Sequence, residues 1–112
     1  MIEEIVRNYL QNKLSTIPVR LEKEDGLPGK YVIIDKTGSS EENHIYAATF
    51  AVQSYADSMY DAAALNERII EYMEALPDER DEVFACELNS DYNFTDTTFR
   101  KYRYQAVFNI VY

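Results

Sequence analysis

The sequence YRYQAVFNIVY, residues 102–112, alternates more regularly than any other stretch of the chain. Each even-numbered residue in it is apolar or aromatic, and polar residues occupy most of the positions between them. This two-residue period is typical of a strand with one face against a core. Because that face is strongly aromatic, the fold depends on which other segments cover it.

Three shorter segments also have strand character. Residues 31–35 (YVIID) are apolar on both faces, which predicts a central strand. Residues 17–21 alternate around Pro18, which favours a short strand near an edge because proline has no amide hydrogen to donate. A further strand is expected over residues 83–88.

Residues 45–55 (IYAATFAVQSY) predict a long strand with two unequal faces. One face carries the larger side chains, and the other carries mostly small ones. The small side chains would let a helix pack closely against that second face. The first face is Tyr46, Ala48, Phe50 and Val52, and the second is Ile45, Ala47, Thr49, Ala51 and Gln53.

Two segments have the three- and four-residue spacing of amphipathic helices. The first covers residues 2–14. The second begins at Ser58, where Ser58 and Asp61 have the Ser-x-x-acid form of a capping box, and we expect it to end at Leu76 because Pro77 follows.

The segments between these elements are polar. Residues 36–43 (KTGSSEEN) show no periodicity and predict a mobile loop, after which His44 begins the next strand. Residues 78–82 form a charged connection, and residues 90–98 predict a turn-rich loop.

The order of elements is helix, three strands, helix, two strands. This order predicts an α+β fold: a mostly antiparallel sheet of about five strands, with two helices on one face. The 112 residues contain no internal repeat or linker, so residues 1–112 are expected to form one domain.

Charge is distributed unevenly along the chain. The formal net charge is −9, and residues 41–82 account for all of the excess, because their only basic residues are Arg68 and Arg80. Such acidity disfavours binding to nucleic-acid phosphates. It fits a solvated helix face with an acidic loop, a surface that must not adhere to DNA, or a surface that imitates DNA.

Residues with catalytic or metal-binding chemistry are scarce. A single cysteine, Cys86, excludes an internal disulfide, and a single histidine, His44, removes most metal and acid–base constellations. No phosphate-binding glycine loop or EF-hand pattern is present. The start of the chain lacks the pattern of a signal peptide, so we expect a cytoplasmic protein with a reduced thiol. From the scarcity of catalytic and metal-binding residues we expect no cofactor, no metal and no enzymatic activity.

Several segments together resemble the tail-terminator proteins of long-tailed bacteriophages and prophages, also called tail-completion or head-to-tail joining proteins. Residues 31–39 (YVIIDKTGS) are similar to their strand followed by a basic-Thr-Gly-Gly loop, with Ser39 where a second glycine is common. Residues 51–58 (AVQSYADS) resemble their VQSWA-S segment, with Tyr55 where tryptophan is common, and an Ala-Ala-Leu helix follows. Residues 102–108 (YRYQAVF) resemble their closing strand, and the resemblance spans about residues 17–112.

The resemblance implies a sheet flanked by helices that assembles as a hexameric ring at the head-proximal end of the tail tube. Such a ring stops tube growth, joins tail to head, and lets DNA pass without specific binding. The implied partners are further copies of the chain, the tail-tube protein and the head-completion or connector protein, with no membrane. The implied location is the host bacterial cytoplasm during assembly and then the virion tail.

On this reading, polar loops and exposed aromatics are candidate contacts with a neighbouring subunit or partner. They are Lys36, Thr37, Glu41, Glu42, Asn43, Tyr60, Tyr92, Phe94 and Arg100. A second set of carboxylates could line the lumen or a ring surface, or pair with basic residues of a neighbour. This acidic set is Asp61, Glu67, Glu71 and Glu74.

Two other classes of function compete with this one. A small acidic inhibitor that mimics DNA would block a host nuclease or other DNA-binding protein, and a small-molecule enzyme is disfavoured by the residue counts above. Self-association distinguishes the structural protein from the inhibitor, because a structural protein should form rings and an inhibitor should be a monomer or dimer.

Overall fold

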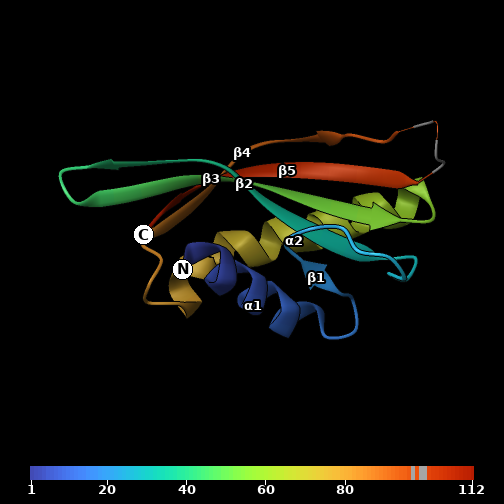
Figure 1. The fold of residues 1–112 in the computed structure, drawn as a ribbon, viewed down its shortest axis with the longest axis horizontal. Helices are drawn as coiled ribbons and strands as arrows, with labels where there is room; N and C mark the ends of the chain where they lie inside the picture. The colour runs from blue at the N-terminus through green and yellow to red at the C-terminus, as the bar shows by residue number, and fades with distance from the viewer. Residues whose placement is uncertain (97, 99–100) are drawn as a thin grey trace.

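The computed structural model describes residues 1–96, 98 and 101–112. Within this part of the chain, two helices cover one face of a five-stranded sheet (Figure 1), as the sequence predicts. The observed element order also matches the predicted α+β order. The elements are α1 (Ile2–Leu14), β1 (Val19–Arg20), β2 (Tyr31–Glu42), β3 (Ile45–Ala56), α2 (Met59–Glu79), β4 (Ala85–Asn93) and β5 (Tyr102–Val111).

The strands lie in the order β1-β2-β3-β5-β4. β1 runs parallel to β2, with Val19 opposite Val32, and the other neighbouring strands are antiparallel. The C-terminal strand β5 therefore lies between β3 and β4, where both of its edges are hydrogen-bonded. Its regular alternation in the sequence reflects this position, with one face against the helices and one face uncovered.

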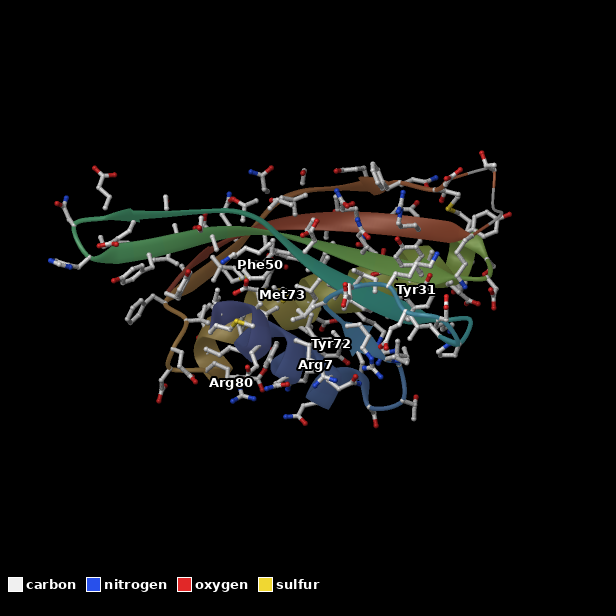
Figure 2. The ribbon with its side chains drawn as sticks, in the orientation of Figure 1. Arg7, Tyr31, Phe50, Tyr72, Met73 and Arg80 are labelled. Carbon is white, nitrogen blue, oxygen red and sulfur yellow. The ribbon has the colours of Figure 1, made fainter. Side chains whose placement is uncertain are left out.

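The core lies between the sheet and the helices. Phe50 of β3 and Phe108 of β5 are fully buried there, together with Ile69 and Met73 of α2. Figure 2 shows Phe50 and Met73 directed toward one another across this layer. Because these side chains come from three elements that meet only in the folded protein, their burial is the main apolar contribution to stability.

The face of β3 that the helices cover is not the one we predicted. Ala48, Phe50 and Val52 pack in the core, whereas the small-residue face, which includes Ala47 and Thr49, points to the other side of the sheet. Burying the larger side chains removes more apolar area from water, and this gain outweighs a closer approach over small residues. The side of the sheet away from the helices is called the open face below, and Leu27 covers part of it by packing against Tyr31, Ile33 and Tyr55.

Residues 36–43 are not a loop, as predicted, but continue the β2–β3 hairpin. Glu42 pairs with Ile45, and Asn43 and His44 form a two-residue turn with φ angles of 52° and 65°. His44 therefore lies in the turn rather than at the start of a strand. Positive φ at both turn positions is the type I′ geometry that matches the twist of a hairpin. Mainly backbone pairing between polar residues holds this segment extended, so the apolar pattern of the sequence did not indicate a strand here.

The predicted strand over residues 83–88 is also shifted. β4 begins at Ala85 and runs to Asn93, with an irregularity between Leu88 and Ser90. Residues 90–93, which were predicted to begin a loop over residues 90–98, therefore belong to the sheet. They pair with β5, where Asn93 lies opposite Tyr104.

The second helix begins as predicted and ends later. Ser58 Oγ accepts a hydrogen bond from the Asp61 amide at 3.1 Å, which confirms the capping box. Pro77 lies inside the helix, which continues to Glu79, and the Arg80 amide donates to the Leu76 carbonyl at 3.0 Å. Proline removes one amide donor in the last turn without preventing the next residues from keeping helical geometry.

A polar contact joins the two helices at the end of α2. The Tyr9 hydroxyl lies 2.6 Å from the Tyr72 carbonyl oxygen and 2.9 Å from Glu79 Oε2, and Lys13 Nζ lies 2.7 Å from Glu79 Oε1. Burial and the bond to Glu79 raise the pKa of Tyr9. The Lys13 ammonium and then the Tyr9 hydroxyl hold the pKa of Glu79 below its usual value.

Candidate functional site

The far ends of β2 and β3 form a hairpin arm, residues 37–46, that reaches beyond the helices at one end of the molecule (Figure 1). Its residues are all exposed, and Ile45 at its tip keeps 58% of its surface in water. β1 pairs with β2 only at Val32 and Ile33. Along the rest of β2, no strand in the described part of the chain occupies its outer edge. An edge of this kind can accept another strand.

The base of the arm is held by specific contacts. Lys36 Nζ lies 3.2 Å from Glu3 Oε2 of α1, and a backbone hydrogen bond together with this ammonium lowers the pKa of Glu3. On the other strand, Tyr46 stacks on Tyr112 with ring centroids 6.0 Å apart, and the Tyr112 amide donates to the Tyr46 carbonyl. The arm is thus anchored at its base and free toward its tip.

The opposite end of the open face carries a group of aromatic and polar side chains, here called the tyrosine belt. Tyr31 of β2 stacks on Tyr55 of β3 with centroids 4.5 Å apart and planes 13° from parallel. Figure 2 shows Tyr31 at the end of the sheet away from the arm. The belt consists of Tyr31, Gln53, Tyr55, Tyr92, Phe94, Arg103 and Gln105.

Hydrogen bonds link the belt across three strands. Arg103 Nη1 donates to the Tyr55 hydroxyl at 2.9 Å, and that hydroxyl donates to Gln53 Oε1 at 3.1 Å. Gln53 Nε2 donates to Gln105 Oε1 at 2.8 Å, and Gln105 Nε2 donates to the Tyr92 hydroxyl. Because each polar group is held by its neighbour, the belt presents a preorganised surface.

A hollow of about 240 Å³ lies beside the belt. Arg103 forms part of its wall and stacks on Phe94, with its guanidinium carbon 4.2 Å from the ring centroid. Lys101 lies 5.3 Å from the centroid of Tyr31 and bonds to Asp57 at 3.0 Å. The residues lining the hollow are Lys23, Tyr55, Asp96, Lys101 and Arg103.

The outward side of α2 carries an acidic stripe. Its residues recur every three or four positions, so they form one row along the helix, and all of them are exposed. Tyr60, at the start of the row, keeps 81% of its surface in water. Within the described residues, no ion pair involves the carboxylates of the stripe. The row is Tyr60, Ala64, Glu67, Glu71, Glu74 and Asp78.

The structure separates the predicted contact residues into two groups. Thr37, Glu41, Glu42 and Asn43 lie on the arm, with Lys36 at its base, whereas Tyr60, Tyr92 and Phe94 lie toward the other end. Arg100 lies outside the described residues. Of the acidic set, three members belong to the stripe, but Asp61 is half-buried beside it, 4.0 Å from Lys30 Nζ.

Sequence reasoning missed some exposed and belt residues. Phe84 keeps 75% of its surface in water just before β4, although its place in an apolar run predicted a strand position. Arg103 and Gln105 belong to the belt because they alternate with the aromatic residues of β5. The alternation was visible in the sequence, but the uncovered state of that face was not.

The groups with catalytic potential lie apart from these surfaces. Cys86 is buried, and this burial raises the pKa of its thiol to about 12, so it holds very little thiolate at neutral pH. Within residues 1–96, 98 and 101–112, no cluster of three or more His, Cys, Asp or Glu side chains has the arrangement to hold a metal ion. No helix in the described chain combines the length and apolar character needed to span a membrane.

Comparison with known proteins identifies a fold likeness. No protein-family model matches the sequence, and no curated protein matches it. Among solved structures, the chain is similar to one described as "Virion of native gene transfer agent (GTA) particle". The TM-score is 0.64 at 14% identity, and the match covers 91% of this chain and 82% of the other. At this identity the likeness shows a shared fold.

Proposed function

We propose that this protein is a structural component of a phage-type virion, and more specifically a tail terminator that forms a ring at the head-proximal end of the tail tube. The observation that carries the proposal is the fold shared with a chain of a gene transfer agent virion over nearly the full length of both. The sequence segments that resemble tail terminators lie on β2, β3, α2 and β5.

The shape of the molecule supports assembly into a ring. A ring of identical subunits requires a head-to-tail interface, in which two different surfaces of each subunit meet. The chain is elongated, with extents of 45 × 25 × 24 Å, and its arm and tyrosine belt lie at opposite ends. Distinct exposed surfaces are thus available for neighbouring subunits and for other virion proteins.

The arm is proposed as the contact with another virion protein, either the tail-tube protein or the head connector. Its β2 edge has no neighbouring strand among the described residues, and its tip offers the exposed side chain of Ile45. Strand addition at such an edge gives affinity through main-chain hydrogen bonds. The contact at Lys36 and Glu3 holds the base of the arm in place for this purpose.

The net charge supports passage of DNA through the ring without adhesion. A net charge of −9 offers few cations to replace the counterions of a phosphate backbone, so non-specific affinity for DNA is low. We propose a role without catalysis, in which the protein acts through its surfaces.

The test is an in-frame deletion of the gene in the phage or prophage that carries it. The proposal predicts tails of uncontrolled length and heads that remain unjoined, as seen by negative-stain microscopy, with recovery when the wild-type gene is supplied on a plasmid. Normal particles from the deletion strain would contradict the proposal.

The acidic stripe also supports the competing proposal of a DNA-mimic inhibitor. Four carboxylates follow one side of α2 between Glu67 and Asp78, and they are exposed. That function predicts a monomer or dimer that displaces DNA from a nuclease in a competition assay, with no effect of gene deletion on particle structure.

A further inference from the structure

We propose that the acidic stripe of one copy docks on the tyrosine belt of the next, with its carboxylates facing the cations of the hollow. This inference rests on the proposed ring and names the two surfaces that would form its subunit interface. The occupant of the belt is therefore a second copy of this chain.

The two surfaces face in opposite directions. The belt lies on the open face, because Tyr31 and Tyr55 form an apolar cluster separate from the main core. The stripe lies on the side of α2 away from the buried residues Leu65, Ile69 and Met73, which pack beneath the other face of the sheet. Surfaces on opposite sides of one subunit meet only in a head-to-tail arrangement, which closes into a ring when the rotation between subunits permits it.

Charge favours the pairing. Three cations, Lys23, Lys101 and Arg103, and one carboxylate, Asp96, line the hollow, and Lys101 also pairs with Asp57. Glu24 and Asp25 lie beside Lys23 in the adjoining depression, so the excess of positive charge is confined to the hollow. Arg103 bonds to a hydroxyl and a carbonyl oxygen, and no carboxylate among the described residues pairs with it. The stripe carries four carboxylates that likewise have no ion-pair partner within the described chain. Complementary charge of this kind selects partners and orients their approach.

The composition of both surfaces also fits a protein interface. Tyrosine and arginine are among the residues most enriched where binding energy concentrates, and the accessible part of the belt contains both, in the exposed Tyr92 and the half-buried Arg103. On the stripe, Tyr60 exposes a large aromatic ring at one end of a row about 27 Å long at 1.5 Å per residue. A rigid receiving surface loses little side-chain entropy when the row docks on it.

Stacking of nucleic-acid bases on the belt is less favoured. Tyr31 and Tyr55 stack on each other and are 4% and 8% exposed, so their rings offer little surface to a base. The overall negative charge also opposes a phosphate backbone.

The test uses reversed charges on each surface separately. The stripe variant is Glu67→Lys with Glu71→Lys, and the belt variant is Lys23→Glu with Lys101→Glu. Lys23→Glu alone serves as a second belt variant, because Lys23 is exposed and no polar contact of its side chain occurs within the described residues. Glu4→Lys with Glu82→Lys changes the net charge as much as the stripe variant does, at exposed sites that belong to neither the stripe nor the belt.

Assembly is measured by analytical ultracentrifugation over a wide range of concentrations, with thermal unfolding as the check on folding. We expect each reversed variant to need at least a tenfold higher concentration to assemble, a change equivalent to about 1.4 kcal/mol. An equimolar mixture of the stripe and belt variants should assemble again, because each reversed surface then meets its complement. The control variant should assemble like the wild type.

A zero-length carboxyl-to-amine cross-linker provides a direct readout. We expect linked peptides that join Lys23 or Lys101 of one copy to Glu67, Glu71 or Glu74 of another. Wild-type-like assembly of the reversed variants, a mixture that stays dissociated, or a wild-type protein that remains monomeric at its highest soluble concentration would each overturn this inference. The gene-deletion experiment tests the proposed function independently of this interface, because a ring can also form through a different interface.

Discussion

The two halves of β2 differ in burial although both pair with β3. Residues 31–34 are buried on both faces, and Ile34 lies opposite Val52 in the core. Residues 38–42 are exposed on both faces, and Glu41 lies opposite Tyr46 in the arm. The hydrogen-bonded ladder continues through both halves, apart from the irregularity between Lys36 and Gly38. Stability therefore resides in the first half, and the second half is free to serve as a contact surface.

Removing a side chain from the buried half should have the largest effect. Ile34 is buried in the core, so Ile34→Ala leaves a cavity and should lower the free energy of unfolding by about 2–5 kcal/mol. Urea titration followed by circular dichroism measures the change. Ile45→Ala in the arm is the matched comparison and should cost less than about 0.5 kcal/mol. Equal losses for the two variants would contradict the division of the β2–β3 hairpin into a buried part and an exposed arm.

Shortening the arm should separate stability from function. Deleting Glu41, Glu42, Ile45 and Tyr46 joins Ser40 and Ala47 directly to the Asn43–His44 turn and keeps the strand register, because Ser40 and Ala47 are already opposite each other. The free energy of unfolding should fall by only about 1 kcal/mol, through the lost contact of Tyr46 with Tyr112.

The same deletion should abolish rescue of the gene-deletion strain, because the arm is the proposed contact with another virion protein. Counting joined particles by negative stain measures this effect. Full rescue by a stably folded short-arm protein would contradict the proposal that the arm contacts another virion protein.

A change in the turn should act in the opposite direction. His44 has a φ of 65°, a conformation that glycine adopts at lower cost, and Asn-Gly is the favoured type I′ turn. Relief of the left-handed backbone, about 1–2 kcal/mol, should exceed the extra unfolded-state entropy of glycine, about 0.5–1 kcal/mol. His44→Gly should therefore stabilise the protein by about 0.5–1 kcal/mol in a thermal or urea titration. Destabilisation would indicate that the histidine side chain makes a contact that strengthens the turn.

Loss of the Glu79 carboxylate should have the smallest effect on stability among these changes. The pKa of Glu79 is lower in the folded protein than its ordinary value of 4.5. Its contribution to stability is therefore complete above the unfolded pKa and is lost as the pH falls through the folded pKa.

Glu79→Gln should lower the melting temperature slightly at neutral pH and reduce its decrease below pH 4.5. Lys13→Met removes the cation and should reduce the decrease in the same way. An unchanged pH profile in both variants would exclude Glu79 as a source of the acid sensitivity.

The sequence predicts the fold where side-chain burial and local backbone structure coincide. The period of residues 102–112, the helix of residues 2–14 and the cap at Ser58 are all confirmed. The β2 side of the arm was missed because it depends on backbone pairing between polar residues, which leaves no apolar period. Pro77 was overinterpreted because a proline in the last helical turn costs little.

The candidate surfaces were only partly predictable. The exposed aromatics Tyr60 and Phe94 and the acidic residues of α2 were visible from the sequence. The tyrosine belt was not, because Gln53, Tyr92 and Arg103 come from three strands whose neighbours only the sheet order defines. Which face of β3 the helices cover also determines which of its side chains remain available for contacts with other molecules. The sequence pattern favoured the small-residue face as the covered one, whereas the helices cover the other face.

The most direct test of the account is the mass and shape of the purified wild-type protein. Light scattering on a size-exclusion column over a wide concentration range gives the mass, and negative-stain microscopy gives the shape. The account predicts a closed ring with a mass near six times the 13.1 kDa of one chain. A particle that keeps the mass of one chain at every concentration would contradict it.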